Sequence, residues 1–383
     1  MKANWNYPTA VRAGAGRSDE LAAICREAGM ASPLLVTDPG LASLPMVTQI
    51  VERCAGEGLN IAVFSDVKPN PTGANIENGV AASRAGQHDG VIAFGGGSGL
   101  DAGKAIAVVA EQTCSLWDLE DVGDNWLNAD PDRIPPIIGV PTTAGTGSEV
   151  GRASVIVNEA EEKKAIIFHP RMLPGTVVLD PELTYGLPAG LTAATGMDAL
   201  SHNLEAFCSP VFHPMAEGIA VEGIRLIKEN LQTAVSDGQN PEARMQMLVA
   251  SSMGATAFQR GLGAMHALAH PLGAVYDAHH GTLNAVLMPY VLKANHSAIK
   301  ETIGRLARYL GLDPNFDAFM DWVLTLRSAI EIPHTLAELI PDDARLDEIG
   351  EMAVIDPSAS TNPIEHSAAS YAKIARAAYA GSL

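Results

Sequence analysis

The stretch GVIAFGGGSGLDAGKAIAV, residues Gly90–Val108, decides how the first half of this chain folds. An apolar run typical of a buried strand leads into a glycine turn, and a pattern of helical period follows. Glycines let the backbone approach a ligand closely, and the N–H groups that open the next helix attract an anion. We interpret the turn as a phosphate cradle for a nucleotide, with a tight structural turn as the alternative.

The turn matches neither of two familiar phosphate-binding templates. Leu100 stands where the third glycine of G-x-G-x-x-G belongs, and Ser98 stands where the P-loop has its first glycine. Asp101 and Lys104 follow on the helix. From the residues alone, they either support a ligand-binding turn or are a capping carboxylate and a solvated lysine.

Strand-like runs on both sides of this stretch predict a parallel sheet. Four apolar runs that end in turns are PLLVTD (33–38), NIAVFSD (60–66), GVIAFGGG (90–97) and IPPIIGVPTTAG (134–145). Segments of helical period separate them, and two more strand-like runs follow at 150–158 and 176–181. Alternation of strands and helices indicates parallel strands covered by helices.

The character of the sequence changes after residue 186. Amphipathic helical patterns dominate from there to Leu383, for example AEGIAVEGIRLIKENLQTAV (216–235). A chain of 383 residues is long enough for two domains. We predict an α/β Rossmann-like nucleotide-binding domain over residues 1–186 and an all-helical domain over residues 187–383.

Composition and charge narrow the class of protein. Hydrophobic residues make up 47% of the chain and charged residues 18%, which is typical of a globular protein. The net charge of −19 argues against a nucleic-acid partner, because phosphate binding needs a clustered basic surface. The four cysteines form no C-x-x-C pair. Residues 1–16 lack the apolar core of a signal peptide, and no apolar run approaches the length of a bilayer span. We expect a cytoplasmic protein with neither nucleic acid nor membrane as a partner.

Two further segments end strands at the edge where ligands bind open α/β sheets. The segment VPTTAGTGSEV (140–150) supplies threonine hydroxyls and glycine backbone. Asp38 ends the first strong strand, where a carboxylate hydrogen-bonds ribose hydroxyls and repels a 2′-phosphate. The alternative for Asp38 is a strand-terminal turn residue.

The helical half carries the sharper chemical signal. Asp198 and His202 are four residues apart, as are His266 and His270, so each pair lies on one face of a helix. Two more histidines follow at 279–280. Imidazoles with one carboxylate suit a divalent transition metal, and we predict a metal site. The sequence has no H-E-x-x-H motif, so a metalloprotease is not indicated.

Together these segments resemble the iron-containing (group III) alcohol dehydrogenases, whose architecture is shared with dehydroquinate synthase. The motifs that carry the resemblance are GGGSGLDAGKAIA, PTTAGTGSEV, GMDALSHNLEAF, GLGAMHALAHPLGA and HHGTLNAVLMP. The resemblance implies a metal-dependent, NAD(P)-linked dehydrogenase that acts on small alcohols or aldehydes and uses Fe²⁺, Zn²⁺ or another divalent ion. It also implies a homodimer or higher homo-oligomer, formed through an N-terminal strand within residues 4–14.

The resemblance also implies roles for individual residues. The implied metal ligands are Asp198, His202, His266 and His280. The implied cofactor-binding residues are Asp38, Gly96, Gly97, Ser98, Asp101, Lys104, Thr142, Thr143, Thr146 and Lys164. Asp38 favours NAD over NADP, and His270 lies near the nicotinamide as a proton relay that does not ligate the metal. His279 receives no role.

Two arginines, Arg152 and Arg260, indicate the class of substrate. Many relatives that reduce simple aldehydes lack a charge at these places, and a guanidinium binds a carboxylate in a fork. The arginines therefore indicate an acid-bearing substrate, such as succinic semialdehyde reduced to 4-hydroxybutyrate. The alternative is that either arginine faces solvent or a carboxylate partner. The segment TNPIEHS departs from the family's usual Asn-Pro-Arg, with Ile364 in place of the arginine.

Two other activities share this architecture. One is a polyol oxidoreductase similar to glycerol dehydrogenase. The other is a lyase similar to dehydroquinate synthase, which uses NAD only transiently and binds a phosphorylated substrate in a basic pocket. The pattern of one aspartate and three histidines favours the dehydrogenase over the lyase, and net turnover of NADH separates them.

Overall fold

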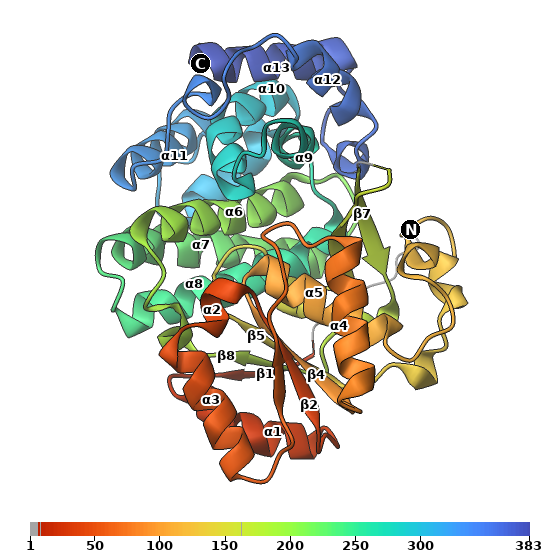
Figure 1. The fold of residues 1–383 in the computed structure, drawn as a ribbon. Helices are drawn as coiled ribbons and strands as arrows, with labels where there is room; N and C mark the ends of the chain where they lie inside the picture. Colours follow the sequence, from red (N-terminus) through yellow and green to blue (C-terminus); the bar gives the residue numbers. More distant parts are fainter. Residues whose placement is uncertain (1–6, 8, 162) are drawn as a thin grey trace. The chain divides into compact units, whose positions relative to one another are not determined.

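The computed structural model describes residue 7, residues 9–161 and residues 163–383 (Figure 1). Internal contacts divide these residues into two compact units, Tyr7–Gly186 and Leu187–Leu383. The first unit contains the predicted cofactor segments, and the second contains the predicted metal ligands. Residues 4–6 and 8 of the expected N-terminal dimer strand lie outside the described residues.

The first unit is built on a parallel sheet with the strand order β1-β8-β5-β4-β2-β3 (Figure 1). Its strands are β1 (Ala10–Ala13), β2 (Pro33–Val36), β3 (Ala62–Phe64), β4 (Gly90–Gly95), β5 (Ile137–Pro141) and β8 (Thr176–Leu179). Each neighbouring pair in this order runs parallel. The predicted Rossmann-like α/β class is confirmed.

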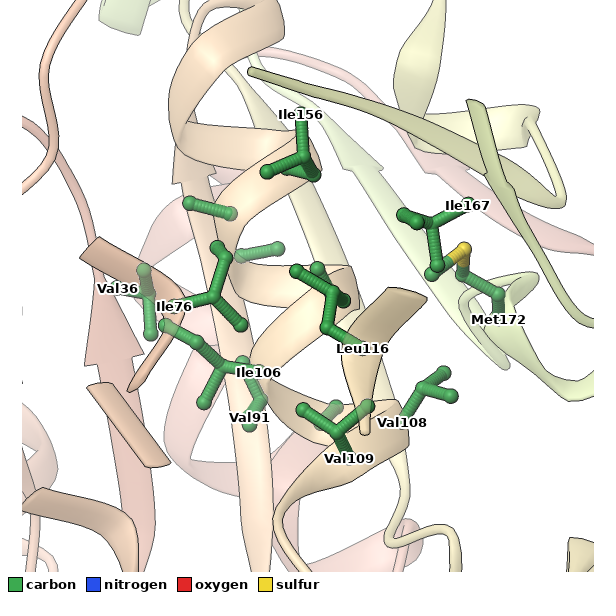
Figure 2. Packing of buried hydrophobic residues seen from close by; sticks show 14 of the residues in the cluster. Val36, Ile76, Val91, Ile106, Val108, Val109, Leu116, Ile156, Ile167 and Met172 are labelled. Atoms are coloured by element: carbon green, nitrogen blue, oxygen red, sulfur yellow. The ribbon is translucent and has the colours of Figure 1, made fainter. Parts of the chain in front are cut away.

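Helices cover both faces of this sheet because side chains alternate along each strand. They are α1 (Leu21–Glu27), α2 (Pro39–Ala42), α3 (Pro45–Gly56), α4 (Gly73–Ala85) and α5 (Gly97–Val109). Val36 and Val91 pack with Ile76 of α4 and Ile106 of α5 (Figure 2). Alternate residues of the same strands join α1 and α3 in a second buried cluster. Burial of both faces explains why these strands are nearly continuous apolar runs.

Two strands of the first unit lie outside the parallel sheet. Strands β6 (Ala153–Asn158) and β7 (Lys163–Phe168) form an antiparallel ribbon. Ile156 and Ile167 belong to the same buried cluster as the α5 side chains (Figure 2). The sequence indicated β6 but not β7, and it did not separate β6 from the sheet, because an apolar pattern does not specify the partner of a strand.

Close packing of α5 against β4 depends on Gly103. A Cβ at Gly103 would lie 2.8 Å from Cα of Ala93. Replacing Gly103 with alanine is therefore expected to lower the free energy of unfolding by about 2 kcal/mol, because the helix must move off the strand. Urea unfolding followed by circular dichroism measures the change.

Gly218, a helical glycine of the second unit, provides the matched control for this prediction. A Cβ at Gly218 would meet no heavy atom within 4 Å. Gly218→Ala is expected to stabilise the protein by up to about 1 kcal/mol through helix propensity. A gain in stability for Gly103→Ala as well would contradict the close contact.

The second unit, over its described residues 187–383, contains helices and no strand, which confirms the predicted helical class. Its α-helices are α6 (Ala189–Cys208), α7 (Pro214–Ser236), α8 (Pro241–Ala257), α9 (Ala264–Tyr276), α10 (His280–Tyr309), α11 (Phe316–Ala329), α12 (Leu346–Val354) and α13 (Ala368–Ala380). Helix α6 packs against α7, α8 and α10, and α9 packs against α10 and α12. None of the helices in the described part of the chain has the length and apolar character that crossing a membrane requires.

Candidate functional site

Helices α6, α9 and α10 of the second unit bring the predicted metal ligands together. Donor atoms of Asp198, His202 and His266 all lie within 4.8 Å of one another, and all three residues are buried. The rings of His202 and His266 are stacked with their centroids 4.7 Å apart. His280, the first residue of α10, places Nε2 3.5 Å from Oδ1 of Asp198. The four side chains therefore form one cluster.

The protonation states of this cluster fit a divalent cation. Burial lowers the pKa of His266 well below its usual range, and the neighbouring His202 acts in the same direction. Burial alone raises the pKa of Asp198, but His202, His280, His266 and the amide of Asn284 outweigh it and lower the pKa to about 2. At neutral pH the cluster therefore offers an imidazole lone pair and a carboxylate, the forms that ligate metals.

Glu205, which the sequence analysis missed, orients one of these ligands. Its buried carboxylate accepts hydrogen bonds from the backbone N–H groups of Gly263 at 2.8 Å and Met265 at 2.7 Å, and lies 2.7 Å from Nδ1 of His266. Burial raises the pKa of Glu205 to about 7, although both N–H groups lower it. A carboxylate at Nδ1 leaves the Nε2 lone pair for a metal. Glu205 follows His202 by three residues on α6, and this helical spacing could have indicated that it lies near the ligands.

His270 lies beside the cluster and is oriented by a second carboxylate. Its ring stacks on that of His280 at a centroid distance of 5.4 Å, and its Nδ1 lies 2.8 Å from Oδ2 of Asp356. Burial raises the pKa of Asp356, but the hydrogen bond with His270 contributes to an overall lowering. Asp356 thus keeps the proton on Nδ1, and Nε2 carries the lone pair. No sequence pattern linked Asp356 to His270, because 86 residues separate them.

His279, adjacent to His280, has a structural contact instead. It is exposed and caps the N-terminus of α10, where its Nδ1 accepts a hydrogen bond from the backbone N–H of Thr282 at 3.4 Å. The structure therefore gives the two neighbouring histidines different surroundings.

In the first unit, three neighbouring strands bring predicted cofactor residues to one edge of the sheet. Strands β5, β4 and β2 are adjacent, and Thr142, Gly96 and Asp38 follow their carboxyl ends. Thr142 is buried, and its backbone N–H donates to the carbonyl of Gly95 at 2.9 Å. Ligands of open α/β sheets bind at this edge.

The glycine turn between β4 and α5 is lined by two of the predicted threonines. Gly96 caps the helix and Gly97 is its first residue. A Cβ at Gly97 would lie 2.8 Å from Cγ2 of Thr146, and one at Gly96 would lie 3.4 Å from Oγ1 of Thr143. The two threonine side chains therefore lie directly against a helix N-terminus, which favours anions.

Ser98 and Lys164 hydrogen-bond to two consecutive residues, Pro69 and Asn70. The hydroxyl of Ser98 donates to the carbonyl of Pro69, and Nζ of Lys164 donates to Oδ1 of Asn70 at 3.0 Å. Lys164 belongs to β7, so the antiparallel ribbon brings this exposed lysine toward the beginning of α5.

Asp101 and Lys104 brace α5 against the segment that follows the threonines. Nζ of Lys104 donates to the carbonyls of Ser148 and Ala153 and lies 3.4 Å from Asp101. Asp101 accepts hydrogen bonds from the hydroxyl of Ser148 and the backbone N–H of Val155. Lys104 is buried, and burial lowers its pKa against the attraction of Asp101. The alternative of a solvated lysine is therefore wrong.

Asp38 is a helix cap at the end of β2. Its Oδ1 accepts a hydrogen bond from the backbone N–H of Leu41 at 3.0 Å. This is the turn role that the sequence left open. It is compatible with a ribose contact as well, because a carboxylate has two oxygens and several lone pairs.

The two arginines have different surroundings. The guanidinium of Arg152 lies over the ring of Phe168, 5.4 Å from its centroid. Arg260 is buried, donates to the carbonyl of Val211 at 2.8 Å and pairs with Glu217 at 3.3 Å. The guanidinium of Arg260 thus holds the turn after α6 in place. Arg260 is therefore a structural residue with a carboxylate partner, which is the alternative left open by the sequence, and the prediction that it binds substrate is wrong.

Each of the two units matches a model of a known protein family. The family model described as iron-containing alcohol dehydrogenase matches residues 8–181, and that of the C-terminal domain of Fe-containing alcohol dehydrogenases matches residues 192–379. The chain is 38% identical over 378 residues to a 4-hydroxybutyrate dehydrogenase of Cupriavidus necator, covering 96% of this chain and 97% of the relative.

Two solved structures are similar over nearly the whole chain. One is a 1,3-propanediol oxidoreductase, with a TM-score of 0.94 and 35% identity over 99% of this chain and 100% of that one. The other is a sulfoacetaldehyde reductase of Bifidobacterium kashiwanohense in complex with NAD⁺, with a TM-score of 0.90 and 29% identity over 99% of both chains.

Proposed function

This chain belongs to the iron-containing alcohol dehydrogenase family, and we propose that it interconverts a short, carboxylate-bearing primary alcohol and its aldehyde with NAD. The family makes it an NAD-linked alcohol or aldehyde oxidoreductase. The observation that carries the proposal is the convergence of Asp198, His202 and His266, with His280 beside them.

We propose that these four residues hold a divalent ion, Fe²⁺ or Zn²⁺. When bound, such an ion polarises the oxygen of the alcohol or aldehyde as a Lewis acid. Glu205 orients His266, and the anionic Asp198 supplies negative charge to balance the cation.

We propose that His270 receives the proton that leaves the alcohol hydroxyl. The carboxylate of Asp356 lies 2.8 Å from its Nδ1, so the lone pair for an incoming proton is on Nε2. Asp356 is thus a positioning residue, and His270 is the group that takes part in proton transfer.

We propose that residues 1–186 form the NAD(P)-binding domain and residues 187–383 the metal-binding domain. Gly96, Gly97 and Ser98 open α5, where backbone N–H groups favour the pyrophosphate. Thr142, Thr143, Thr146 and Lys164 complete the proposed contacts, with Asp101 and Lys104 bracing the turn. Hydride transfer itself is the chemistry of the nicotinamide, and the protein supplies binding and orientation.

We propose that Arg152 binds the carboxylate of the substrate. Two of the relatives are named for anionic substrates, 4-hydroxybutyrate and sulfoacetaldehyde, and one is named for the neutral 1,3-propanediol. Arg152 favours the anionic class, because its planar guanidinium matches a carboxylate in two parallel hydrogen bonds.

Metal-stripped protein reloaded anaerobically with Fe²⁺ or Zn²⁺ tests these proposals by NADH formation. We expect Fe²⁺-dependent oxidation of 4-hydroxybutyrate in preference to 1,4-butanediol, which replaces the carboxylate with a hydroxymethyl group. Arg152→Gln is expected to lower kcat/KM for 4-hydroxybutyrate by about tenfold to a hundredfold, the value of a charged hydrogen bond, and to leave 1,4-butanediol unchanged. Arg152→Lys keeps the positive charge but loses the two parallel N–H donors of the guanidinium.

Three other results of these assays would contradict parts of the proposal. Equal losses on both substrates would show that Arg152 does not select the acid. Oxidation of glycerol in preference to either substrate would favour the polyol oxidoreductase. Absence of net NADH formation on every alcohol, with NAD bound, would favour the lyase.

We also propose a homodimer or higher homo-oligomer, with β1 in the interface. Strand β1 lies at one end of the sheet order, and an edge strand offers backbone groups to a second strand. A cytoplasmic location stays a prediction.

A further inference from the structure

Asn284 lies among the proposed metal ligands, although no motif singled it out. It is buried on α10, one turn after His280. Its Nδ2 lies 2.8 Å from Oδ1 of Asp198, 3.2 Å from Nε2 of His266 and 3.1 Å from Nε2 of His280. The amide NH₂ group thus faces three of the four atoms that are proposed to hold the ion.

The chemistry of these neighbours determines which end of the amide faces them. A carboxylate oxygen of Asp198 only accepts hydrogen bonds. Nε2 of His266 is also an acceptor, because Nδ1 of the same ring faces Glu205. Only a hydrogen-bond donor or a cation fits next to such atoms, so in the metal-free protein the NH₂ group interacts with lone pairs that a cation would bind.

The other end of the amide is unsatisfied. Oδ1 of Asn284 is buried and has no hydrogen-bond partner among the described residues. A buried acceptor without a partner is costly, and native proteins rarely retain one without a reason. The side chain therefore satisfies its neighbours at the expense of its own oxygen.

Binding of a cation reverses this balance. The cation takes up the lone pairs of Asp198, His266 and His280, and the NH₂ group, the positive end of the amide dipole, then faces a positive charge. We propose that the amide of Asn284 turns over when the ion binds, so that Oδ1 faces the ion as a fifth protein ligand. This rotation of the amide removes the unfavourable contact between the NH₂ group and the cation, and it gives the buried Oδ1 a partner.

This inference deepens the proposed function, because it takes Asp198, His266 and His280 as metal ligands. It makes Asn284 a determinant of which metal binds. Zn²⁺ typically has four protein ligands in structural sites and only three in catalytic ones, whereas non-haem Fe²⁺ sites have further coordination positions open. A fifth, amide ligand would therefore favour Fe²⁺ over Zn²⁺.

Two variants of Asn284, compared with wild type, test the proposal with Co²⁺ as the probe. Asn284→Leu keeps the size of the side chain and removes both polar atoms, and Asn284→Asp presents oxygen only. We expect Asn284→Leu to bind Co²⁺ about tenfold to a hundredfold more weakly, and Asn284→Asp to bind it at least about tenfold more tightly. The visible absorption of bound Co²⁺ is expected to become more intense in Asn284→Leu, because four-coordinate Co²⁺ absorbs more strongly than five-coordinate Co²⁺.

Thermal unfolding of the metal-free proteins adds a readout that does not depend on activity. Asn284→Asp is expected to lower the Tm of the metal-free protein, because two carboxylates then face each other, and Co²⁺ is expected to restore it. Asn295→Leu, on the same helix, is the control. It breaks the buried hydrogen bonds between Asn295 and Asn362, so it is expected to lower the Tm without changing Co²⁺ affinity.

Unchanged Co²⁺ affinity and spectrum in Asn284→Leu would overturn the inference. If that variant does not fold, Asn284→Asp decides, and Co²⁺ binding no tighter than wild type would overturn it. Failure of the wild-type protein to bind Co²⁺ is a different result, because it would overturn the metal site and the proposed function with it.

Discussion

Replacing His280 with alanine is expected to lower the rate of alcohol oxidation by at least about a thousandfold, whereas replacing the adjacent His279 with asparagine leaves the rate close to wild type. Nε2 of His280 lies 3.5 Å from Oδ1 of Asp198, within the proposed ligand set. Loss of a ligand weakens a charge stabilisation of several kcal/mol, and each factor of ten in rate corresponds to about 1.4 kcal/mol.

The control matters because the two histidines are neighbours in the chain. His279 caps α10, and asparagine is among the best N-cap residues, so His279→Asn keeps the helix start while removing the imidazole. Iron content and the rate of NADH formation are measured for both variants after loading with Fe²⁺. Retention of iron and full activity in His280→Ala would exclude His280 from the site.

Replacing Asp38 with serine is expected to raise the ratio of kcat/KM for NADP⁺ to that for NAD⁺ by about a hundredfold. A carboxylate at the end of β2 repels the 2′-phosphate of NADP⁺, and a like-charge contact of this kind costs several kcal/mol. Serine also caps helices, so its hydroxyl oxygen is expected to accept the hydrogen bond from the N–H of Leu41 in place of the carboxylate. The variant therefore removes the charge without removing the turn.

Steady-state rates with both cofactors measure this ratio, and Asp38→Asn is the companion variant. Asparagine keeps the shape of the side chain and a capping oxygen but is neutral, so it is expected to shift the ratio in the same direction. An unchanged ratio in both variants would mean that Asp38 is a helix cap only and that another residue discriminates against the 2′-phosphate.

Most of the cluster proposed to hold the metal was predictable, because its signal is local. Residues four apart lie on one face of a helix, so the pairs Asp198–His202 and His266–His270 required only helical period and an apolar context. What spacing did not show is that His266 and His270 differ in role. His266 joins the cluster, and His270 is held by Asp356 from a distant segment.

Two charged side chains show what the sequence left open. Lys104 and Arg260 are charged residues that the sequence placed at a turn and near substrate. The structure buries both, with their donors bound to backbone carbonyls from distant segments. Sequence gives the charge of such a side chain, but only the folded chain shows whether a carbonyl, a carboxylate or a ligand receives its hydrogen bonds.

The sequence by itself determined the fold class, most strands of the first half and the helical character of the second, because hydrophobic period and glycine placement act over a few residues. It also indicated the metal chemistry. It did not determine the order of the strands in the sheet, nor the pairing of β6 with β7. Only the tertiary structure brought Glu205 to His266, Asp356 to His270 and Asn284 to the ligand atoms. These contacts join residues 18 to 86 positions apart, and their partners are selected by packing that no local pattern encodes.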